Sequence, residues 1–179
     1  GVYLIAADTN VGKTSLLTSL TLDLSEHNAN VCVVSLSLDD NYWEVHNRLV
    51  ANSAGIPIGQ ALMGNFESPE MRRRFLDGTE KLTALRNDRR LVIVETQALA
   101  DLGAGENLYE QTMSALPLFI GEETAVNKGR RLVICVDNVS NLNSFNPSDM
   151  NDSSGALILG LQRIAKAANI PIVCTTESI

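Results

Sequence analysis

Five short runs of apolar residues recur along the chain, separated by longer segments in which apolar positions have helical spacing. The runs are 2–7 (VYLIAA), 31–38 (VCVVSLSL), 90–96 (RLVIVET), 131–137 (RLVICVD) and 170–176 (IPIVCTT). Each is rich in Val, Ile and Leu without strict alternation, which is typical of parallel strands covered on both faces. Strands that alternate with helices predict one α/β domain over residues 1–179, with a doubly wound, mostly parallel sheet and helices on both faces.

The segments between these runs carry start and stop signals for helices. Asp39 or Asp40 is expected to cap the helix that follows the second strand, and Gly55 is expected to end it. Ser68 precedes Pro69 in a pattern that favours a helix start. The segment 138–155, rich in Asn, Ser and Asp, predicts a long loop after the fourth strand, either a connector or a substrate-contacting loop.

Composition excludes some classes of protein. The chain is 45% hydrophobic and 20% charged, as in globular domains, and its formal net charge of −7 argues against a surface that binds nucleic acid everywhere. It has no run of eighteen apolar residues and no secretory signal, so we expect a cytoplasmic protein that does not span a membrane. Cys32, Cys135 and Cys174 lie in predicted strands and are expected to be buried, reduced thiols rather than zinc ligands.

A phosphate-binding motif follows the first predicted strand. The segment 7–14 (ADTNVGKT) lies between that strand and a predicted helix, which is the context of a P-loop. Lys13 is expected to reach the β- and γ-phosphates of ATP, and Thr14 to bind Mg²⁺. Ala7 replaces the usual first glycine and adds only a methyl group if its φ is negative. The expected nucleotide-binding residues are Asp8, Thr9, Asn10, Val11, Gly12, Lys13, Thr14 and Ser15.

A candidate metal ligand ends the fourth apolar run. Asp137 follows a core strand, the usual position of the Walker B carboxylate, where it would hold Mg²⁺ together with Thr14. The alternative is a turn-forming aspartate. Arginine clusters at 72–74, 89–90 and 130–131 are interpreted chiefly as solvated faces and ion pairs.

Beyond these motifs, the order of segments resembles the RecA-like motor domain of DnaB-type replicative helicases across nearly the whole chain. The most diagnostic stretches are 35–66 (SLSLDDNYWEVHNRLVANSAGIPIGQALMGNF) and 161–178 (LQRIAKAANIPIVCTTES). The resemblance implies a RecA-like P-loop NTPase that forms a homo-oligomeric ring, hydrolyses ATP between subunits and moves single-stranded DNA through a central channel. It also implies a DNA-facing loop from Asn138, a structural role for Arg48, and a chain that is a fragment, since family members continue into an arginine finger.

Three departures from that family concern the chemistry. The family's catalytic glutamate position holds Ser37, which is not basic near neutral pH. Asp39 is the candidate replacement base, with Asp40 beside it and helix capping as the competing role of both. Glu177 stands where the family has a glutamine that senses the γ-phosphate, so this sensing is lost or Glu177 serves as a base instead. Lys13 keeps its catalytic position. The presumed DNA loop lacks lysine and arginine, which weakens the case for DNA.

Three functions therefore remain open. The first is the ATP-driven motor core of a DnaB-like helicase. The second is a catalytically weak nucleotide-binding module with a regulatory or loading role, which Ser37 and Glu177 favour. The third is a signalling or recombination ATPase of the RecA or KaiC type, against which the stretch 35–66 argues.

Overall fold

A parallel sheet forms the centre of the computed structural model, which describes residues 1–38, 40–140 and 153–177. Its strand order is β1-β5-β4-β2-β3, and every pair of neighbours is parallel. The predicted α/β fold is confirmed. The strands of the described residues are β1 (Val2–Ala7), β2 (Val31–Ser37), β3 (Leu91–Glu95), β4 (Arg131–Asp137) and β5 (Ile172–Glu177).

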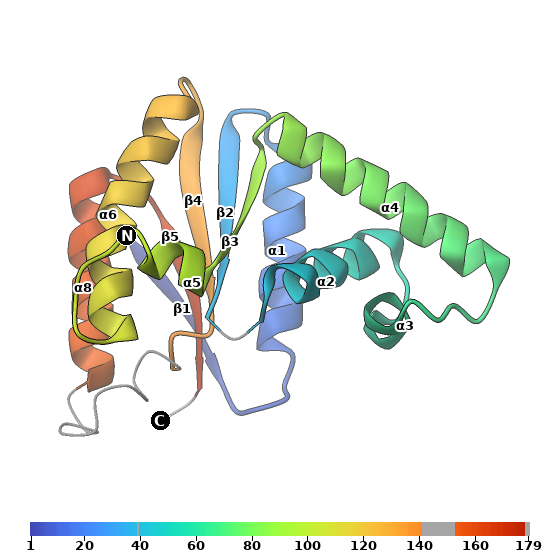
Figure 1. Cartoon of the computed structure of the whole chain (residues 1–179), viewed down its shortest axis with the longest axis horizontal. Coiled ribbons are helices and arrows are strands. Elements are labelled where there is room, and N and C mark those ends of the chain that lie inside the picture. The colour runs from blue at the N-terminus through green and yellow to red at the C-terminus, as the bar shows by residue number, and fades with distance from the viewer. Residues whose placement is uncertain (39, 141–152, 178–179) are drawn as a thin grey trace.

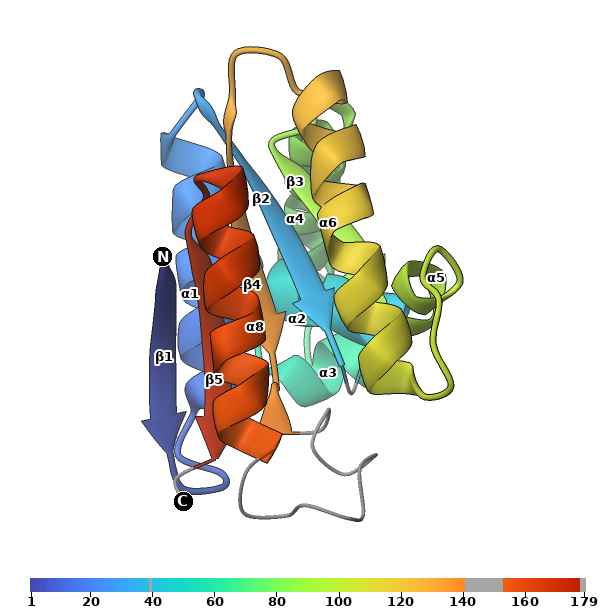
Figure 2. The same cartoon turned by 90° about the vertical axis from the view of Figure 1, so that its left-hand side faces the viewer.

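Helices cover both faces of this sheet. On one face lie α1, α2 and α4, and on the other lie α6 and α8 (Figures 1 and 2). The short α3 and the beginning of α4 lie farthest from the strands (Figure 1). The described helices are α1 (Lys13–His27), α2 (Tyr42–Ala54), α3 (Ile58–Met63), α4 (Pro69–Asn87), α5 (Thr96–Ala100), α6 (Leu108–Val126) and α8 (Ser153–Ala168).

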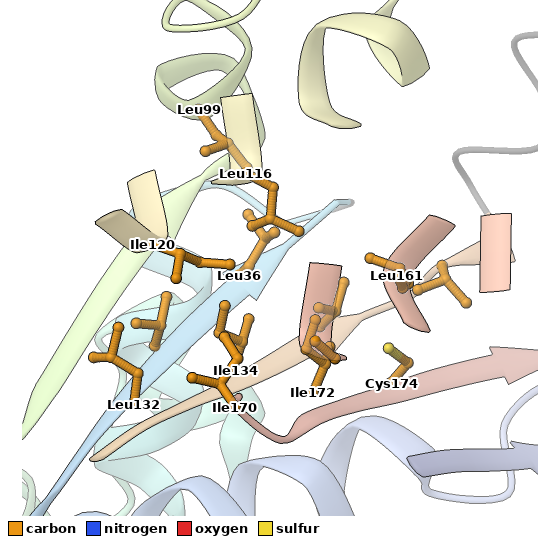
Figure 3. Packing of buried hydrophobic residues seen from close by; sticks show 14 of the residues in the cluster. Leu36, Leu99, Leu116, Ile120, Leu132, Ile134, Leu161, Ile170, Ile172 and Cys174 are labelled. Atoms are coloured by element: carbon orange, nitrogen blue, oxygen red, sulfur yellow. The ribbon is translucent and has the colours of Figure 1, made fainter. Parts of the chain in front are cut away.

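The inner strands β2 and β4 bury apolar side chains on both faces, which explains why their sequences do not alternate, whereas the edge strand β1 has no buried residue. Figure 3 shows the larger cluster, in which side chains of α6 and α8 meet those of the sheet. Its labelled members are Leu36, Leu99, Leu116, Ile120, Leu132, Ile134, Leu161, Ile170, Ile172 and Cys174. A second cluster on the opposite face joins α1, α2 and α4 to β2, β3 and β4.

The three cysteines belong to these clusters, as predicted. Cys32, Cys135 and Cys174 are free and buried. Burial raises the pKa of Cys32 and of Cys135 to about 11, and that of Cys174 to about 12, because a thiolate is poorly solvated there. These thiols therefore fill the core as apolar groups.

The start of α2 corrects one expectation. Its N-cap is Asn41 and not Asp40, because Asn41 Oδ1 accepts from Glu44 N–H at 3.1 Å while the Glu44 carboxylate accepts from Asn41 N–H at 3.0 Å. This reciprocal pair satisfies two amides at the helix start and leaves the Asp40 side chain for other contacts. The other signals are confirmed, since Gly55 ends α2 at a φ of 62° and Ser68 caps α4.

The parallel strands bring their carboxyl ends to one edge of the sheet, at the bottom of Figure 1. In register, Ser37 lies between Glu95 on one side and Asp137 on the other, and Ala7 lies beside Glu177. The P-loop follows β1 at the same edge. In folds of this kind, ligands bind outside the carboxyl ends of the strands.

The opposite, amino edge gathers arginines, and their interpretation as ion-pairing residues is confirmed there. Arg89 Nη2 lies 2.7 Å from Glu123 Oε2, and Arg130 Nη2 lies 3.1 Å from Asp88 Oδ1. Arg90 Nη2 donates to the Glu26 carbonyl oxygen at 2.7 Å. Among the described helices, none is long and apolar enough to cross a membrane.

Candidate nucleotide site

The predicted phosphate-binding loop lies between β1 and α1 and contains two residues with positive φ. Asn10 and Gly12 adopt left-handed conformations, with φ values of 63° and 94°. Gly12 immediately precedes α1, so the loop leads into the positive end of a helix of fifteen residues. Ala7 is the last residue of β1 and its φ is not positive, so its methyl group fits without backbone strain.

Lys13 is held against the loop that it follows. Its side-chain Nζ donates to the carbonyl oxygens of Ala7 at 2.8 Å and Asp8 at 2.7 Å, and the residue is 9% exposed. The ammonium group therefore lies beside the first residues of the loop. It is positioned to exchange these carbonyl oxygens for phosphate oxygens, which are stronger acceptors for a cation.

A small cavity joins the P-loop helix to the strand ends. Its volume is about 20 Å³, and its lining includes Thr14, Ser37, Asp40, Arg48 and Asp137. A hydroxyl and a carboxylate are oxygen ligands of the kind that Mg²⁺ prefers, so the side chains of Thr14 and Asp137 in this lining fit the ion. Thr14 and Asp137 are the residues that would hold it. The structure brings these two residues to one cavity, and their roles in binding nucleotide and metal stay predictions.

The carboxylate of Asp137 is oriented by its neighbour strand. Thr175 of β5 donates its hydroxyl to Asp137 Oδ1. Because Thr175 is fully buried, this bond holds the carboxylate at the tip of β4. A hydrogen bond from a neighbouring side chain can in this way fix the orientation of a carboxylate that binds a metal ion.

Asp40 and Arg48 form the most prominent ion pair of the site. Arg48 Nη2 donates to Asp40 Oδ1 at 3.3 Å, and Arg48 Nε lies 3.1 Å from Asp40 Oδ2. The side chains are 19% exposed for Asp40 and 31% exposed for Arg48. Desolvation by burial raises the pKa of Asp40, and it outweighs the opposing effect of Arg48; Glu44 and Asp137 add to the rise.

A second cavity lies beside the first, across Arg48. It has a volume of about 130 Å³ and shares Thr14, Thr18 and Arg48 with the smaller cavity. Ser15, a predicted phosphate-binding residue, lines it. The start of α1 therefore borders both cavities. Ser15 lines the larger one, and the smaller one is lined by the carboxylates of Asp40 and Asp137.

The other predicted site residues are distributed unevenly. Asp8, Thr9, Asn10 and Val11 form the exposed loop between β1 and Gly12. Glu177 is exposed at the tip of β5, where its backbone N–H donates to Ser140 Oγ at 2.9 Å, and it does not line the small cavity. Asp39 lies outside the described residues, as do residues 141–152 of the predicted DNA loop.

One carboxylate of this edge was not predicted. Glu95 ends β3 beside Ser37, and its Oε1 accepts from the backbone N–H of Tyr42 at 2.6 Å. Tyr42 is the first residue of α2, so Glu95 stabilises the positive end of that helix. The available signal was the position of Glu95 at the end of an apolar run, the same signal that identified Asp137.

Comparisons with known proteins agree with this fold. No protein-family profile matches the sequence, and no curated protein matches it either. Among solved structures, the chain is similar to one described as a DnaB-like replicative helicase and its interactions with primase, with a TM-score of 0.69 and 18% identity. The match covers 98% of this chain and 38% of that chain. The fold is therefore that of a DnaB-like helicase domain, and the chain spans about two fifths of that protein.

Proposed function

We propose that the chain is the ATP-binding motor core of a DnaB-like helicase, coupling ATP hydrolysis to movement on single-stranded DNA. One observation carries the proposal: Thr14 of the P-loop helix and Asp137 at the tip of β4 line the same small cavity. A P-loop and a strand-end carboxylate on one cavity are the parts that a Mg²⁺-nucleotide site requires. The fold shared with a DnaB-like helicase supports the choice of class.

The residues of the chain have distinct roles in that proposal. The amides of residues 8–15 and the start of α1 bind the phosphates, and Lys13 neutralises charge on the β- and γ-phosphates. Thr14 and Asp137 orient the metal ion, and Thr175 orients Asp137. When bound, Mg²⁺ neutralises charge that develops on the phosphoryl group.

Calorimetric titration with Mg²⁺-ATP tests the nucleotide site. Lys13→Ala is expected to weaken binding by roughly 100-fold or more, because it removes charge-assisted bonds worth about 1.5–3 kcal/mol each. Lys128→Ala is the matched control, since Lys128 is exposed in the turn before β4, at the opposite edge of the sheet. Equal affinity of wild type and Lys13→Ala would refute the proposal.

Single-stranded DNA is the proposed polymer, and a ring of identical subunits the proposed assembly. Both come from the likeness to DnaB-like helicases. Fluorescence anisotropy with a labelled oligonucleotide, with and without Mg²⁺-ATP, tests DNA binding, and sedimentation velocity tests the assembly. A nucleotide-dependent rise in anisotropy supports the proposed motor function. A chain that binds ATP but does not bind the oligonucleotide argues against it.

A nucleotide-binding module with weak turnover is the second candidate. The observation that favours it is Ser37, which is 4% exposed at the end of β2 and carries no carboxylate. Steady-state phosphate release, measured with and without single-stranded DNA, separates the two functions. Turnover stimulated by DNA supports the motor, whereas tight ATP binding without turnover supports the module.

A further inference from the structure

The strand-end position that faces the P-loop helix holds a serine, and the structure shows what that serine does. Ser37 Oγ accepts a hydrogen bond from the backbone N–H of Asp40 at 2.9 Å. The hydroxyl thereby fixes the turn between β2 and α2. Because α2 is capped independently by Asn41, this turn delivers the Asp40 side chain into the cavity rather than to the helix start.

The same cavity brings Asp40 to the reacting end of the proposed site. Its lining contains Asp40 together with Thr14 and Asp137, the two proposed metal ligands. Its volume is only about 20 Å³, so the Asp40 side chain lies close to the position of the proposed metal ion. A carboxylate in this position can accept a proton from a water that is bound beside the metal ion and the phosphates.

The competing carboxylates of this edge have other positions. Glu95 accepts the Tyr42 N–H at 2.6 Å and is absent from the lining of the small cavity. Glu177 is exposed at the tip of β5, beside the beginning of the P-loop. Ser37 lines the cavity but has no basicity near neutral pH.

We infer that Asp40 is the catalytic base of this site, moved three residues along the chain from Ser37, and that Arg48 restrains it through the Asp40–Arg48 ion pair. This inference rests on the proposed ATP site. The oxygen of water bonds to the γ-phosphorus, the bond from phosphorus to the β,γ-bridging oxygen breaks, and ADP leaves with that electron pair. Asp40 takes one proton of the water and later releases it to solvent, so the products are ADP and inorganic phosphate.

Arg48 gives the inference its sharpest control. Asp40→Asn and Arg48→Gln break the same ion pair, but only Asp40→Asn removes the carboxylate. If Asp40 is the base, Asp40→Asn lowers single-turnover ATP hydrolysis by about 100-fold or more. Arg48→Gln, which frees the carboxylate, hydrolyses ATP faster than wild type.

Binding and folding are measured on the same variants. Calorimetry with Mg²⁺-ATP and thermal unfolding monitored by circular dichroism should show that Asp40→Asn still folds and binds nucleotide with nearly wild-type affinity. Asp77→Asn, the same change on the exposed surface of α4, serves as the control for both measurements. This readout is independent of turnover.

The outcomes separate the inference from the proposed function. If Asp40→Asn is less than 100-fold slower than Arg48→Gln, the ion pair is structural and the inference is overturned. It is also overturned if Asp39→Asn abolishes hydrolysis while Asp40→Asn does not, or if wild type binds ATP without hydrolysing it. In each of these cases the nucleotide site stands, whereas a wild-type chain that fails to bind Mg²⁺-ATP removes the proposed function itself.

Discussion

At the amino edge of the sheet, arginine side chains reach carboxylates and carbonyl oxygens of neighbouring elements, as Arg89 does with Glu123 and Arg130 with Asp88. At the carboxyl edge, carboxylates gather instead: Asp137 and Asp40 share one small cavity, and Glu95 and Glu177 end β3 and β5 at the same edge. Lys13 and Arg48 are cations on this side of the fold, and both contact oxygen atoms of the chain itself.

The difference shows which charges stabilise the fold and which are available to a ligand. Pairs at the amino edge join α4, α6 and the strand starts, so their charges are matched within the folded chain. The carboxylates of Asp40 and Asp137 lie close enough that Asp137 contributes to the raised pKa of Asp40. Negative charge concentrated around a hydroxyl-lined cavity is stabilised by a bound cation.

Between the two edges, the largest expected difference comes from changing Asp137 to Asn (Asp137→Asn). It removes a proposed metal ligand and should weaken Mg²⁺-ATP binding by about 10–100-fold, while the free energy of unfolding changes little because Thr175 can still donate to the Asn oxygen. Asp88→Asn, the same change at the amino edge, is the control. Calorimetry and urea unfolding measure the two quantities, and a loss of nucleotide affinity in Asp88→Asn would break the distinction between the edges.

Arg89→Ala is expected to have a smaller effect, and on stability instead of nucleotide affinity. Arg89 Nη2 donates to both carboxylate oxygens of Glu123, at 2.9 and 2.7 Å, and Glu123 is 13% exposed. Loss of this charged hydrogen-bond donor should lower the free energy of unfolding by about 1–2 kcal/mol, with ATP affinity unchanged. Arg131→Ala, on an exposed side chain nearby, should cost less than about 0.5 kcal/mol. Equal losses in the two variants would contradict the assignment.

The smallest effect concerns the pH dependence of stability at Asp40. Desolvation raises its folded-state pKa, aided by Glu44 and Asp137 and opposed by Arg48. When the pKa of a carboxyl group is higher in the folded than in the unfolded state, its protonated form stabilises the fold. This contribution is fully present below the unfolded-state pKa and is lost as the pH rises through the folded-state pKa. Asp40→Asn should therefore be slightly more stable than wild type at pH 7, with the difference shrinking toward pH 3. Urea unfolding across that range measures it, and a less stable Asp40→Asn at pH 7 would be the contrary result.

The strands could be predicted closely because their sequences carry a strong signal. The run at 131–137 coincides with β4, and the run at 90–96 differs from β3 by one residue at each end. The last strand begins at Ile172, two residues later than predicted, because Ile170 N–H still closes α8 on Ala165 O and Pro171 has no N–H to pair. Helix α6 has a weaker signal, since Pro117 lies inside it.

The site could be predicted only in part. The P-loop and Asp137 follow from local sequence, because each depends on one strand end. The choice among Asp39, Asp40 and Glu95 depends on contacts between segments. These contacts are the hydrogen bond from Asp40 N–H to Ser37 Oγ, the Asn41 cap and the bond from Tyr42 N–H to Glu95. No single stretch of sequence encodes them, so position in the chain alone could not identify the side chain that enters the cavity.

The contacts of Lys13 have a consequence for how a nucleotide associates. The ammonium group already bonds two carbonyl oxygens of its own loop. Under the proposed function, phosphate oxygens would therefore replace these internal acceptors when the nucleotide binds. Because the bonds already hold the Lys13 side chain in place, less of its conformational entropy would be lost on binding.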